Sequence, residues 1–504
     1  MQTRRLFGTS GIRGVVNQDL SLDFCRRVAL ALGTTLPQSS TVCIATDTRV
    51  SRDVIKEAIT TGLLSCGVNV VDLGILPTPA LALLTRESDF AAGIMVTASH
   101  NPPEFNGIKL FAHDASGYSQ AQEVEIEKIF FGKQFRQGKK GTLEQAQDAK
   151  QRYLSFIKGK FSLTGSEQHP GASGGCKDDG SFGEGKLSLT GFEQQSTAGN
   201  CDDGDRFREG KLSLPEFNHH LKVVVDPGNG AASRFASDIF VNMGLNVIPV
   251  NDEPDGLFPG RNPEPKEDTL QGTINFLRQH NADLAICFDG DADRVVFCDK
   301  DGFLGFNEPI AFISTLAVKR TGKKKIATTV ETGTLLDLAV KDLGVEVVRG
   351  RVGDVAVAHL VQQLDAALGV EQVGVYIMPE VGYYPDSIFA SLFLLSQLSD
   401  AGEIRQFFQG IPRLFFEKAR VSCPNELKES VMARAKEKVH IFAPDEINTL
   451  DGLRLEFADS WMLIRASGTE PVIRVISESM SQKQTDELIS KGKKLVQSLV
   501  EANK

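Results

Sequence analysis

The stretch LLSCGVNVVDLG, residues 63–74, decides the fold class of this chain. It opens with apolar residues at helical spacing, passes through Gly67, which suits the left-handed residue that ends a helix, and continues into β-branched residues that favour a strand. The same unit returns as IFVNMGLNVIPV (239–250) and LAVKDLGVEVVRG (338–350). Helices alternating with apolar strands predict three related α/β/α domains with mainly parallel sheets.

Two other regions depart from this unit. After Gly410, short strands at 461–464 and 472–477 precede an amphipathic helix at 482–500, which predicts a smaller C-terminal α+β domain. Between residues 158 and 218 the chain is rich in Gly, Ser, Asp and Gln, and GKFSLTG recurs as GKLSLTGFE and GKLSLPEF. That composition cannot bury a core, so it predicts a flexible, low-complexity repeat insertion.

The resulting division has four domains and one insertion. The last repeat resembles a calcium loop, but its third position is Phe207, which offers no oxygen ligand, so a mobile surface insertion is the preferred interpretation. The predicted segments are 1–158 (domain I), 159–218 (insertion and linker), 219–322 (domain II), 323–410 (domain III) and 411–504 (domain IV), with a helix predicted over about 143–158 at the end of domain I.

Composition restricts the class of partner. A net charge of −10 argues against binding to nucleic acid or to an anionic membrane, because both need a broad basic face. The eight cysteines form no C-x-x-C pair, and no apolar run is long enough to span a bilayer. We therefore expect a cytoplasmic protein, monomeric or homodimeric, that acts on a small molecule.

The stretch GIMVTASHNPPEFNGIKLF (93–111) combines a buried strand with a polar turn. The strand ends at Val96, and Pro102 with Pro103 prevents a helix directly afterwards, so Ser99 and His100 lie on a loop at the carboxyl end of a strand. Ligands bind at that edge of open α/β sheets. A turn held only by local side-chain hydrogen bonds is the alternative for this stretch taken alone.

The stretch AICFDGDADRVVF (285–297) places Asp289, Asp291 and Asp293 at alternate positions between two apolar strands. Three carboxylates in one tight turn repel each other unless a hard cation neutralises them, and Mg²⁺ is the expected ion. An EF-hand is excluded, because its sixth position would be Arg294 and its twelfth Lys300. An acidic hairpin without metal is the weaker alternative.

The stretch LIRASGTEPVIRV (463–475) supplies hydroxyls, backbone N–H groups and guanidinium forks, which together suit a tetrahedral phosphate. Its candidate ligands are Arg465, Ser467, Gly468, Thr469 and Arg474. A plain Ser-Gly turn is the alternative. A hydroxyl nucleophile, a divalent cation and a separate phosphate site together indicate phosphoryl transfer, which depends on positioning and charge neutralisation.

The sequence resembles the α-D-phosphohexomutase family, which includes phosphoglucomutase, phosphomannomutase and phosphoglucosamine mutase. The resemblance rests on FGTSGIRG (7–14), TASHNP (97–102), FDGDADR (288–294) and RASGTEP (465–471), in the family's order. It implies a Mg²⁺-dependent isomerase with a central cleft, to which each domain contributes one loop. The implied reaction interconverts hexose 6-phosphate and hexose 1-phosphate through a phosphoserine and a hexose 1,6-bisphosphate, which serves as intermediate and activator.

The resemblance also implies roles for individual residues. Ser99 would carry the phosphoryl group, and its phosphate would bind one Mg²⁺ per active site together with Asp289, Asp291 and Asp293. Arg13, His100 and Lys109 would surround the transfer, with Arg294 on the substrate. Lys109 is the preferred general base or acid, because nearby cations should lower its pKa; His100 is the alternative. The phosphate that is not transferred would bind to Arg465, Ser467, Gly468 and Thr469, with Arg474 nearby.

The third family loop is where this chain departs from the pattern. It reads GVEQVGVYIMPE (369–380), with the sugar-binding Glu371 retained but Val373 where the family has a hydroxyl and Val375 where many members have His or Gly. Loss of a hydrogen-bonding hydroxyl should weaken sugar binding or change the preferred sugar. The rival hypothesis is therefore a catalytically decayed relative that only binds sugar phosphates or regulates. The sequence leaves the choice among glucose, mannose and glucosamine open.

Overall fold

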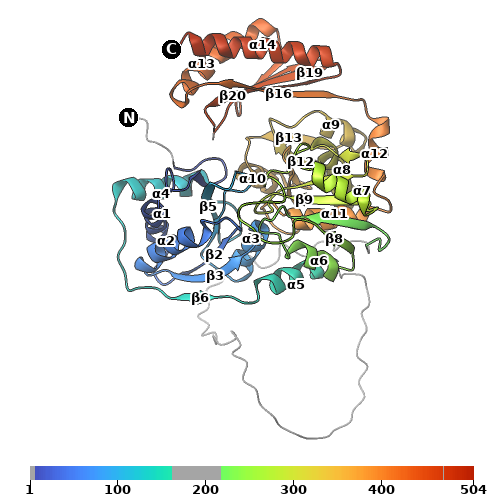
Figure 1. Cartoon of the computed structure of the whole chain (residues 1–504). Helices are drawn as coiled ribbons and strands as arrows, with labels where there is room; N and C mark the ends of the chain where they lie inside the picture. The colour runs from blue at the N-terminus through green and yellow to red at the C-terminus, as the bar shows by residue number, and fades with distance from the viewer. Residues whose placement is uncertain (1–5, 162–216, 469, 504) are drawn as a thin grey trace, which may run out of the picture.

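Four sheets succeed one another along the chain in the computed structural model, which describes residues 6–161, 217–468 and 470–503 (Figure 1). We number the corresponding domains I to IV in chain order. The three helix–glycine–strand units are confirmed: Gly67, Gly244 and Gly344 have φ angles of +74°, +85° and +61°. Each glycine lies between a helix and a strand, where a left-handed residue lets the chain turn back into the sheet.

Domain I has a six-stranded sheet in the order β1-β5-β4-β2-β3-β6, covered by helices on both faces. Its strands are β1 (Ile12–Val15), β2 (Thr41–Thr46), β3 (Asn69–Ile75), β4 (Ala92–Val96), β5 (Phe105–Ala112) and β6 (Leu143–Gln145). Its helices are α1 (Leu22–Thr35), α2 (Arg52–Ser65), α3 (Thr78–Glu87), α4 (Gln120–Gly132) and α5 (Ala149–Phe161).

Domain II has a five-stranded sheet in the order β11-β10-β9-β7-β8, and domain III a four-stranded sheet in the order β13-β12-β14-β15. The elements of domain II are β7 (Lys222–Asp226), α6 (Ala236–Asn242), β8 (Asn246–Pro249), α7 (Gln271–Gln279), β9 (Leu284–Phe288), β10 (Val295–Asp299) and β11 (Gly302–Phe303). The last helix of domain II is α8 (Asn307–Thr321). The elements of domain III are β12 (Lys325–Thr329), α9 (Leu335–Val340), β13 (Glu346–Gly350), α10 (Asp354–Leu364), β14 (Gly369–Glu371), β15 (Val375–Ile377), α11 (Ser387–Gln397) and α12 (Glu403–Phe407).

The three α/β sheets are mixed, with parallel strands at the centre and antiparallel strands at one edge. In each, a strand parallel to its neighbour turns back into an antiparallel hairpin: β4–β5, β9–β10 and β14–β15. The hairpin connections (97–104, 289–294 and 372–374) are too short for a parallel crossover, which needs a dozen or more residues. Candidate site residues lie in the first two connections and, in domain III, at Glu371 directly before the third, so the three loops occupy equivalent places in three similar domains.

Domain IV is an antiparallel sheet in the order β16-β20-β19-β18-β17, with helices packed on one face, as the sequence predicted. Figure 1 shows it as a separate lobe beside α9 and β13 of domain III. Its elements are β16 (Phe415–Ser422), α13 (Lys428–Lys438), β17 (Glu446–Asn448), β18 (Leu453–Phe457), β19 (Ser460–Ala466), β20 (Val472–Ser479) and α14 (Gln482–Glu501).

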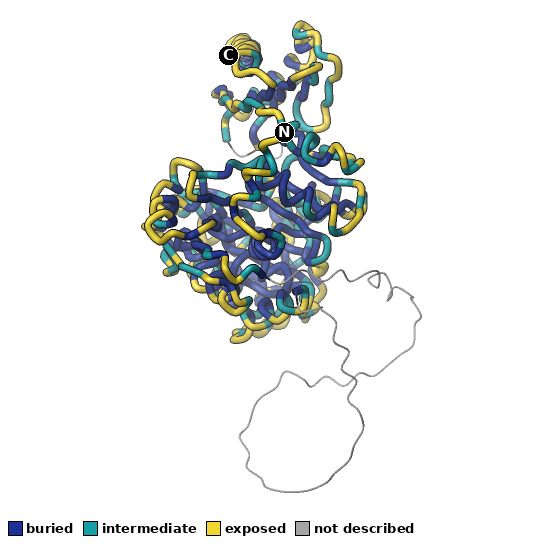
Figure 2. Tube along the Cα trace, turned by 90° about the vertical axis from the view of Figure 1, so that its right-hand side faces the viewer, coloured by how far each residue is buried: buried dark blue, intermediate teal, exposed yellow. Residues whose placement is uncertain are grey.

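Domains I to III share one continuous hydrophobic core. Cys43 and Ala45 of domain I, Ile286 of domain II and Leu394 of domain III belong to a single cluster of buried apolar residues. In Figure 2 this body is buried along its interior strands and exposed on its outer helices and loops. The hairpin loops of these three domains are therefore fixed relative to one another, whereas domain IV has its own core.

The end of domain I differs from the prediction. A helix was expected over 143–158, but residues 143–145 form the edge strand β6, and the helix runs from Ala149 to Phe161. Its last turn was assigned to the insertion, yet Phe161 is buried and its ring lies 5.0 Å from that of Phe217. The ends of the predicted insertion thus belong to the core. The repeats themselves lie outside the described residues, and the domain boundaries stay predictions.

No helix among the described residues is long and apolar enough to cross a membrane. The thiols of Cys25, Cys43, Cys66, Cys287, Cys298 and Cys423 are free and buried. Cys176 and Cys201 lie outside the described residues.

Asp386 should make the stability of the protein depend on pH. This buried carboxylate caps α11 by accepting the Phe389 N–H at 2.9 Å and also accepts the Tyr153 hydroxyl of α5, and burial raises its pKa from 3.8 to about 7. Between about pH 4 and pH 7 the folded protein holds a proton that the unfolded chain has released, so the free energy of unfolding falls as pH rises through that window. The shift corresponds to up to about 4 kcal/mol.

Asp386→Asn keeps a hydrogen-bond acceptor but cannot ionise. We expect its melting temperature relative to wild type to be higher at about pH 8 than at about pH 5. A difference that does not change between the two pH values would show that Asp386 is not buried in this way.

Candidate active site

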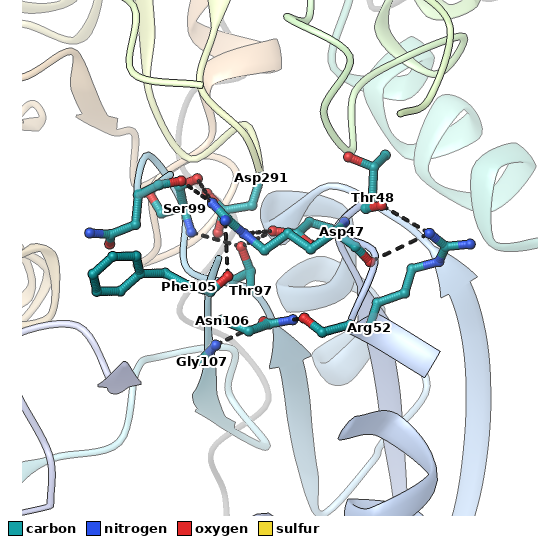
Figure 3. Close-up of polar contacts among 12 residues, drawn as sticks. Asp47, Thr48, Arg52, Thr97, Ser99, Phe105, Asn106, Gly107 and Asp291 are labelled. Atoms are coloured by element: carbon teal, nitrogen blue, oxygen red, sulfur yellow. Dashed lines mark hydrogen bonds and ion pairs between the residues drawn. The ribbon is translucent and has the colours of Figure 1, made fainter. Parts of the chain in front are cut away.

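The nucleophile loop (97–104) connects β4 to β5 and holds Ser99 at the carboxyl end of a buried strand. Ser99 is fully buried and has a φ angle of +52°, a left-handed conformation that is uncommon for a residue with a side chain. Its N–H donates to the Thr97 hydroxyl at 2.8 Å (Figure 3). Its own Oγ donates to Asp289 Oδ2 at 2.6 Å. The Ser99 hydroxyl is thus directed at the acidic loop of domain II.

The metal loop (289–294) connects β9 to β10 and brings three aspartates together. One oxygen of each of Asp289, Asp291 and Asp293 lies within 4.8 Å of the others, and all three residues are buried. The Oδ1 atoms of Asp291 and Asp293 are buried and accept no hydrogen bond from any described residue. Burial and the two neighbouring charges raise the pKa of Asp289. Hard oxygen ligands with unused lone pairs fit a divalent cation such as Mg²⁺.

Lys109 reaches this loop from β5. Its Nζ lies 2.6 Å from Asp291 Oδ2 and 2.5 Å from Asp293 Oδ2, while the Thr78 hydroxyl also donates to Asp291. The predicted lowering of the Lys109 pKa is wrong for this arrangement: burial lowers it, but the two carboxylates outweigh burial and raise the pKa above its usual value. Lys109 is therefore a charged partner of the metal loop.

His100 and two arginines surround the same point. His100 Nδ1 lies 3.3 Å from Ser99 Oγ, and burial, with the charges of Arg294 and Arg13, lowers its pKa far enough to keep the ring neutral. Burial and the Arg294 charge also lower the pKa of Arg13, which donates to Asn101 at 3.2 Å. Arg294 Nε lies 3.7 Å from Asp293 Oδ1. The structure thus gathers all the residues proposed for the transfer from domains I and II.

Glu371 stands at the end of β14, beside the recognition loop (372–374). It is buried and accepts the Gly353 N–H at 2.8 Å; burial and the nearby Asp354 charge raise its pKa to about 7. Val373 packs against the apolar cluster of domain III, and Val375 is buried in β15. Both valines contribute to the domain III core.

The loop of domain IV that the sequence predicts to bind phosphate lies against domain III. Arg465 is buried between Glu331 of domain III and Asp451 of domain IV, at 3.1 Å from each. Arg474 pairs with Glu470 at 2.9 Å. Both arginines of the predicted phosphate site are thus paired with carboxylates in this structure.

The remaining predicted residues of this loop lie between the two arginines. Ser467 is buried and its Oγ accepts the Glu470 N–H at 3.1 Å, whereas Gly468 is exposed. A Cβ at Gly468 would lie 3.6 Å from Thr9 Cγ2, so this loop also approaches the first motif of domain I. Thr469 lies outside the described residues.

Several residues of the site have no clear signal in the sequence. Lys428 donates to the backbone oxygens of Ser467 and Glu470, and Ser10 donates to Asp354 at 2.8 Å, joining domain I to domain III. Glu331 pairs with Arg465, as described above. Arg49 donates to the Ser99 backbone oxygen in the nucleophile loop. An Arg or Glu after a buried strand is a weak signal, because such residues are more often exposed.

Four family sequence models match successive segments that together make up most of the chain. Those of phosphoglucomutase/phosphomannomutase α/β/α domains I, II and III match residues 4–137, 208–302 and 308–413, and that of the C-terminal domain matches 419–491. The chain is 35% identical over 501 residues, 98% of each chain, to a probable phosphoglucosamine mutase of Pyrococcus horikoshii. It is 30% identical over 503 residues, also 98% of each chain, to a phosphoglucomutase/phosphomannomutase of Thermococcus kodakarensis.

Solved structures share the fold. A phosphoglucomutase/phosphomannomutase family protein from Burkholderia thailandensis superposes with a TM-score of 0.78 at 24% identity, over 98% of this chain and 97% of that one. An N-acetylphosphoglucosamine mutase of Aspergillus fumigatus, in complex with GlcNAc-6P and magnesium, has a TM-score of 0.52 at 14% identity, over 98% and 96% of the two chains.

Proposed function

Because the chain belongs to the phosphoglucomutase/phosphomannomutase family, we propose that it is a phosphohexomutase that interconverts hexose 6-phosphate and hexose 1-phosphate. The observation that carries the proposal is the Ser99 hydroxyl, 2.6 Å from Asp289 in a cluster of three buried carboxylates. A binding protein needs no nucleophile beside a cation site, so this geometry argues against the catalytically decayed relative. Assays of hexose 6-phosphate with Mg²⁺ and a hexose 1,6-bisphosphate test the activity.

The reaction would proceed in two phosphoryl transfers. Phosphorylated Ser99 gives its phosphoryl group to a sugar hydroxyl, so the Oγ–P bond breaks, a sugar O–P bond forms, and the hydroxyl proton passes to a base. The Ser99 oxygen released in this step takes up a proton. The bisphosphate then turns round, and its other phosphoryl group passes to Ser99: that sugar O–P bond breaks, an Oγ–P bond forms, and the Ser99 hydroxyl proton passes through the base to the released sugar oxygen. Asp289, Asp291 and Asp293 would hold one Mg²⁺, which supplies charge neutralisation at the phosphoryl oxygens.

The side chains around Ser99 divide the remaining roles. His100 lies within reach of Ser99 Oγ, whereas Lys109 lies between two carboxylates, so geometry favours His100 for proton exchange at the serine. Arg13 and Arg294 would neutralise phosphate charge, and Arg465, Ser467, Gly468, Thr469 and Arg474 would bind the phosphate that is not transferred.

The proposal also includes the preferred sugar. Relatives named phosphoglucosamine mutase favour glucosamine phosphate as the substrate. A hexose 1,6-bisphosphate would act as activator and intermediate, and the buried free thiols agree with a cytoplasmic location.

At about pH 8, where the Glu371 carboxylate is charged, Glu371→Ala should lower kcat/KM by roughly ten- to a hundredfold on the preferred sugar, because a hydrogen bond to a charged group is worth about 1.5–3 kcal/mol. Glu380→Ala is the matched control, since Glu380 also lies in domain III but pairs with Arg320. The measurement is kcat/KM on glucose, mannose and glucosamine phosphates. If Glu371→Ala has no effect on any sugar, the recognition role lies elsewhere in domain III.

A further inference from the structure

We propose that Arg49 is the positioning residue that aims Ser99 at the metal loop. Arg49 follows β2 and is fully buried, with its Nε 3.0 Å from Asp47 Oδ2. The inference rests on the proposed function, because it assigns a role in the transfer that Ser99 performs. Nothing in the sequence motifs points to it.

The Arg49 guanidinium donates to three backbone oxygens of the nucleophile loop and to that of Phe105, the first residue of β5. Nη2 donates to the Ser99 oxygen at 3.0 Å and to the Asn101 oxygen at 2.5 Å. Nη1 donates to the Pro102 oxygen at 2.5 Å and to the Phe105 oxygen at 3.0 Å. With the Asp47 bond, all five N–H donors of the planar fork are used. A lysine has three donors at one point and cannot reproduce this set.

Asp47 acts, through Thr97, on the peptide unit at the other side of the Ser99 Cα. The Thr97 hydroxyl donates to Asp47 Oδ2 at 2.7 Å and accepts the Ser99 N–H at 2.8 Å (Figure 3). The Asp47–Arg49 pair thus holds both the N–H and the C=O of Ser99. This is the residue whose left-handed backbone needs support from its surroundings.

The same carbonyl faces the metal loop. A Cβ added at Gly290 would lie 2.5 Å from the Ser99 oxygen, so the two loops are in close contact at this point. The Ser99 carbonyl therefore lies between the metal loop on one side and the Arg49 guanidinium on the other. By holding this carbonyl, Arg49 fixes the backbone of the residue whose Oγ bonds to Asp289.

A similar buried Arg–Asp pair contacts the backbone directly before the metal loop. Arg261 is buried, pairs with Asp226 at 2.9 Å, and donates through Nη2 to the Phe288 oxygen at 2.6 Å, directly before Asp289. In both domains the Asp of a buried Arg–Asp pair lies at the end of a central parallel strand, β2 or β7. The Arg of the pair donates to the backbone where the neighbouring strand of the sheet, β4 or β9, leads into its loop. This similarity supports a positioning role, since both loops meet at the Ser99–Asp289 contact.

Arg49→Lys should lower kcat by about a hundredfold or more while KM changes by less than about threefold, because a misplacement of about 1 Å at the reacting atoms costs about that much in rate. The rate of Ser99 phosphorylation by hexose 1,6-bisphosphate in a single turnover should fall equally. The control is Arg136→Lys: Arg136 also donates to buried carbonyls of domain I, those of Gly33, Leu36 and Cys66, but does not touch the loop. It should lower the melting temperature and leave kcat nearly unchanged.

An Arg49→Lys protein with wild-type kcat and a lowered melting temperature would overturn the inference. If Arg49→Lys does not fold, Thr97→Val decides, because it removes only the hydroxyl that links Asp47 to Ser99; a kcat lowered about tenfold with unchanged KM supports positioning, and unchanged kcat overturns it. Wild-type protein that takes no phosphate at Ser99 would instead reject the proposed function, and the positioning role with it.

Discussion

Ser99→Ala is expected to lower turnover by more than about four orders of magnitude with the fold retained. The Ser99 Oγ is the atom that carries the phosphoryl group, and loss of a covalent nucleophile has effects of about that size in other enzymes. Alanine keeps the Cβ and can occupy the same backbone conformation, so the main structural loss is the hydrogen bond to Asp289. The measurement is kcat on each hexose phosphate, with melting temperature as the test of folding.

The control for this variant is Ser116→Ala. Ser116 lies on the turn after β5, where its hydroxyl bonds only to Asp114 among the described residues. Its removal should leave kcat unchanged. Turnover at the wild-type rate in Ser99→Ala would reject the phosphoserine mechanism.

Asp291→Asn is expected to weaken Mg²⁺ binding and to lower kcat by at least about a hundredfold. Asp291 offers a buried Oδ1 with no hydrogen-bond partner among the described residues, and its other oxygen accepts from Lys109 and Thr78. The amide removes one charge from the cluster, so the cation loses a ligand and the phosphoryl oxygens lose its neutralising charge. Binding is measured by titration calorimetry with Mg²⁺, independently of activity.

Asp299→Asn is the matched control, because Asp299 ends the same hairpin at β10 but pairs with Arg405. Its Mg²⁺ affinity should equal that of the wild type, although its stability should fall. Treatment with a chelator should abolish turnover in the wild type, and Mg²⁺ should restore it. Turnover that survives both the chelator and Asp291→Asn would show that the aspartate cluster has another role.

Local rules predicted much of the fold because they depend on neighbouring residues. A glycine between a helix and a strand needs only its own φ angle, and Gly67, Gly244 and Gly344 adopt the expected left-handed conformation. The tight turn between two apolar strands at 289–294 was predicted, but the antiparallel pairing of β4 with β5 and of β14 with β15 was not, because an apolar run reads the same in either strand direction. The strand at 143–145 was missed because its short, exposed sequence pairs only at the sheet edge with β3.

In the site, too, the sequence predicted what depends on neighbouring residues and missed what depends on residues distant in the chain. Ser99 and the three aspartates were found from their spacing, but the sign of the Lys109 pKa shift depends on carboxylates more than 180 residues away in sequence. Arg49 was missed for a similar reason: its partners lie on a loop about 50 residues further along the chain, and nothing near Arg49 identifies them.

The intact mass of the purified protein, measured after incubation with a hexose 1,6-bisphosphate and Mg²⁺, is the most direct test of whether Ser99 carries the phosphoryl group. We expect a gain of one phosphoryl group that maps to Ser99, is absent from Ser99→Ala, and is lost when hexose phosphate is added in excess. Wild-type protein that gains no phosphate under these conditions, or that gains it at another residue, would contradict a mutase that works through Ser99.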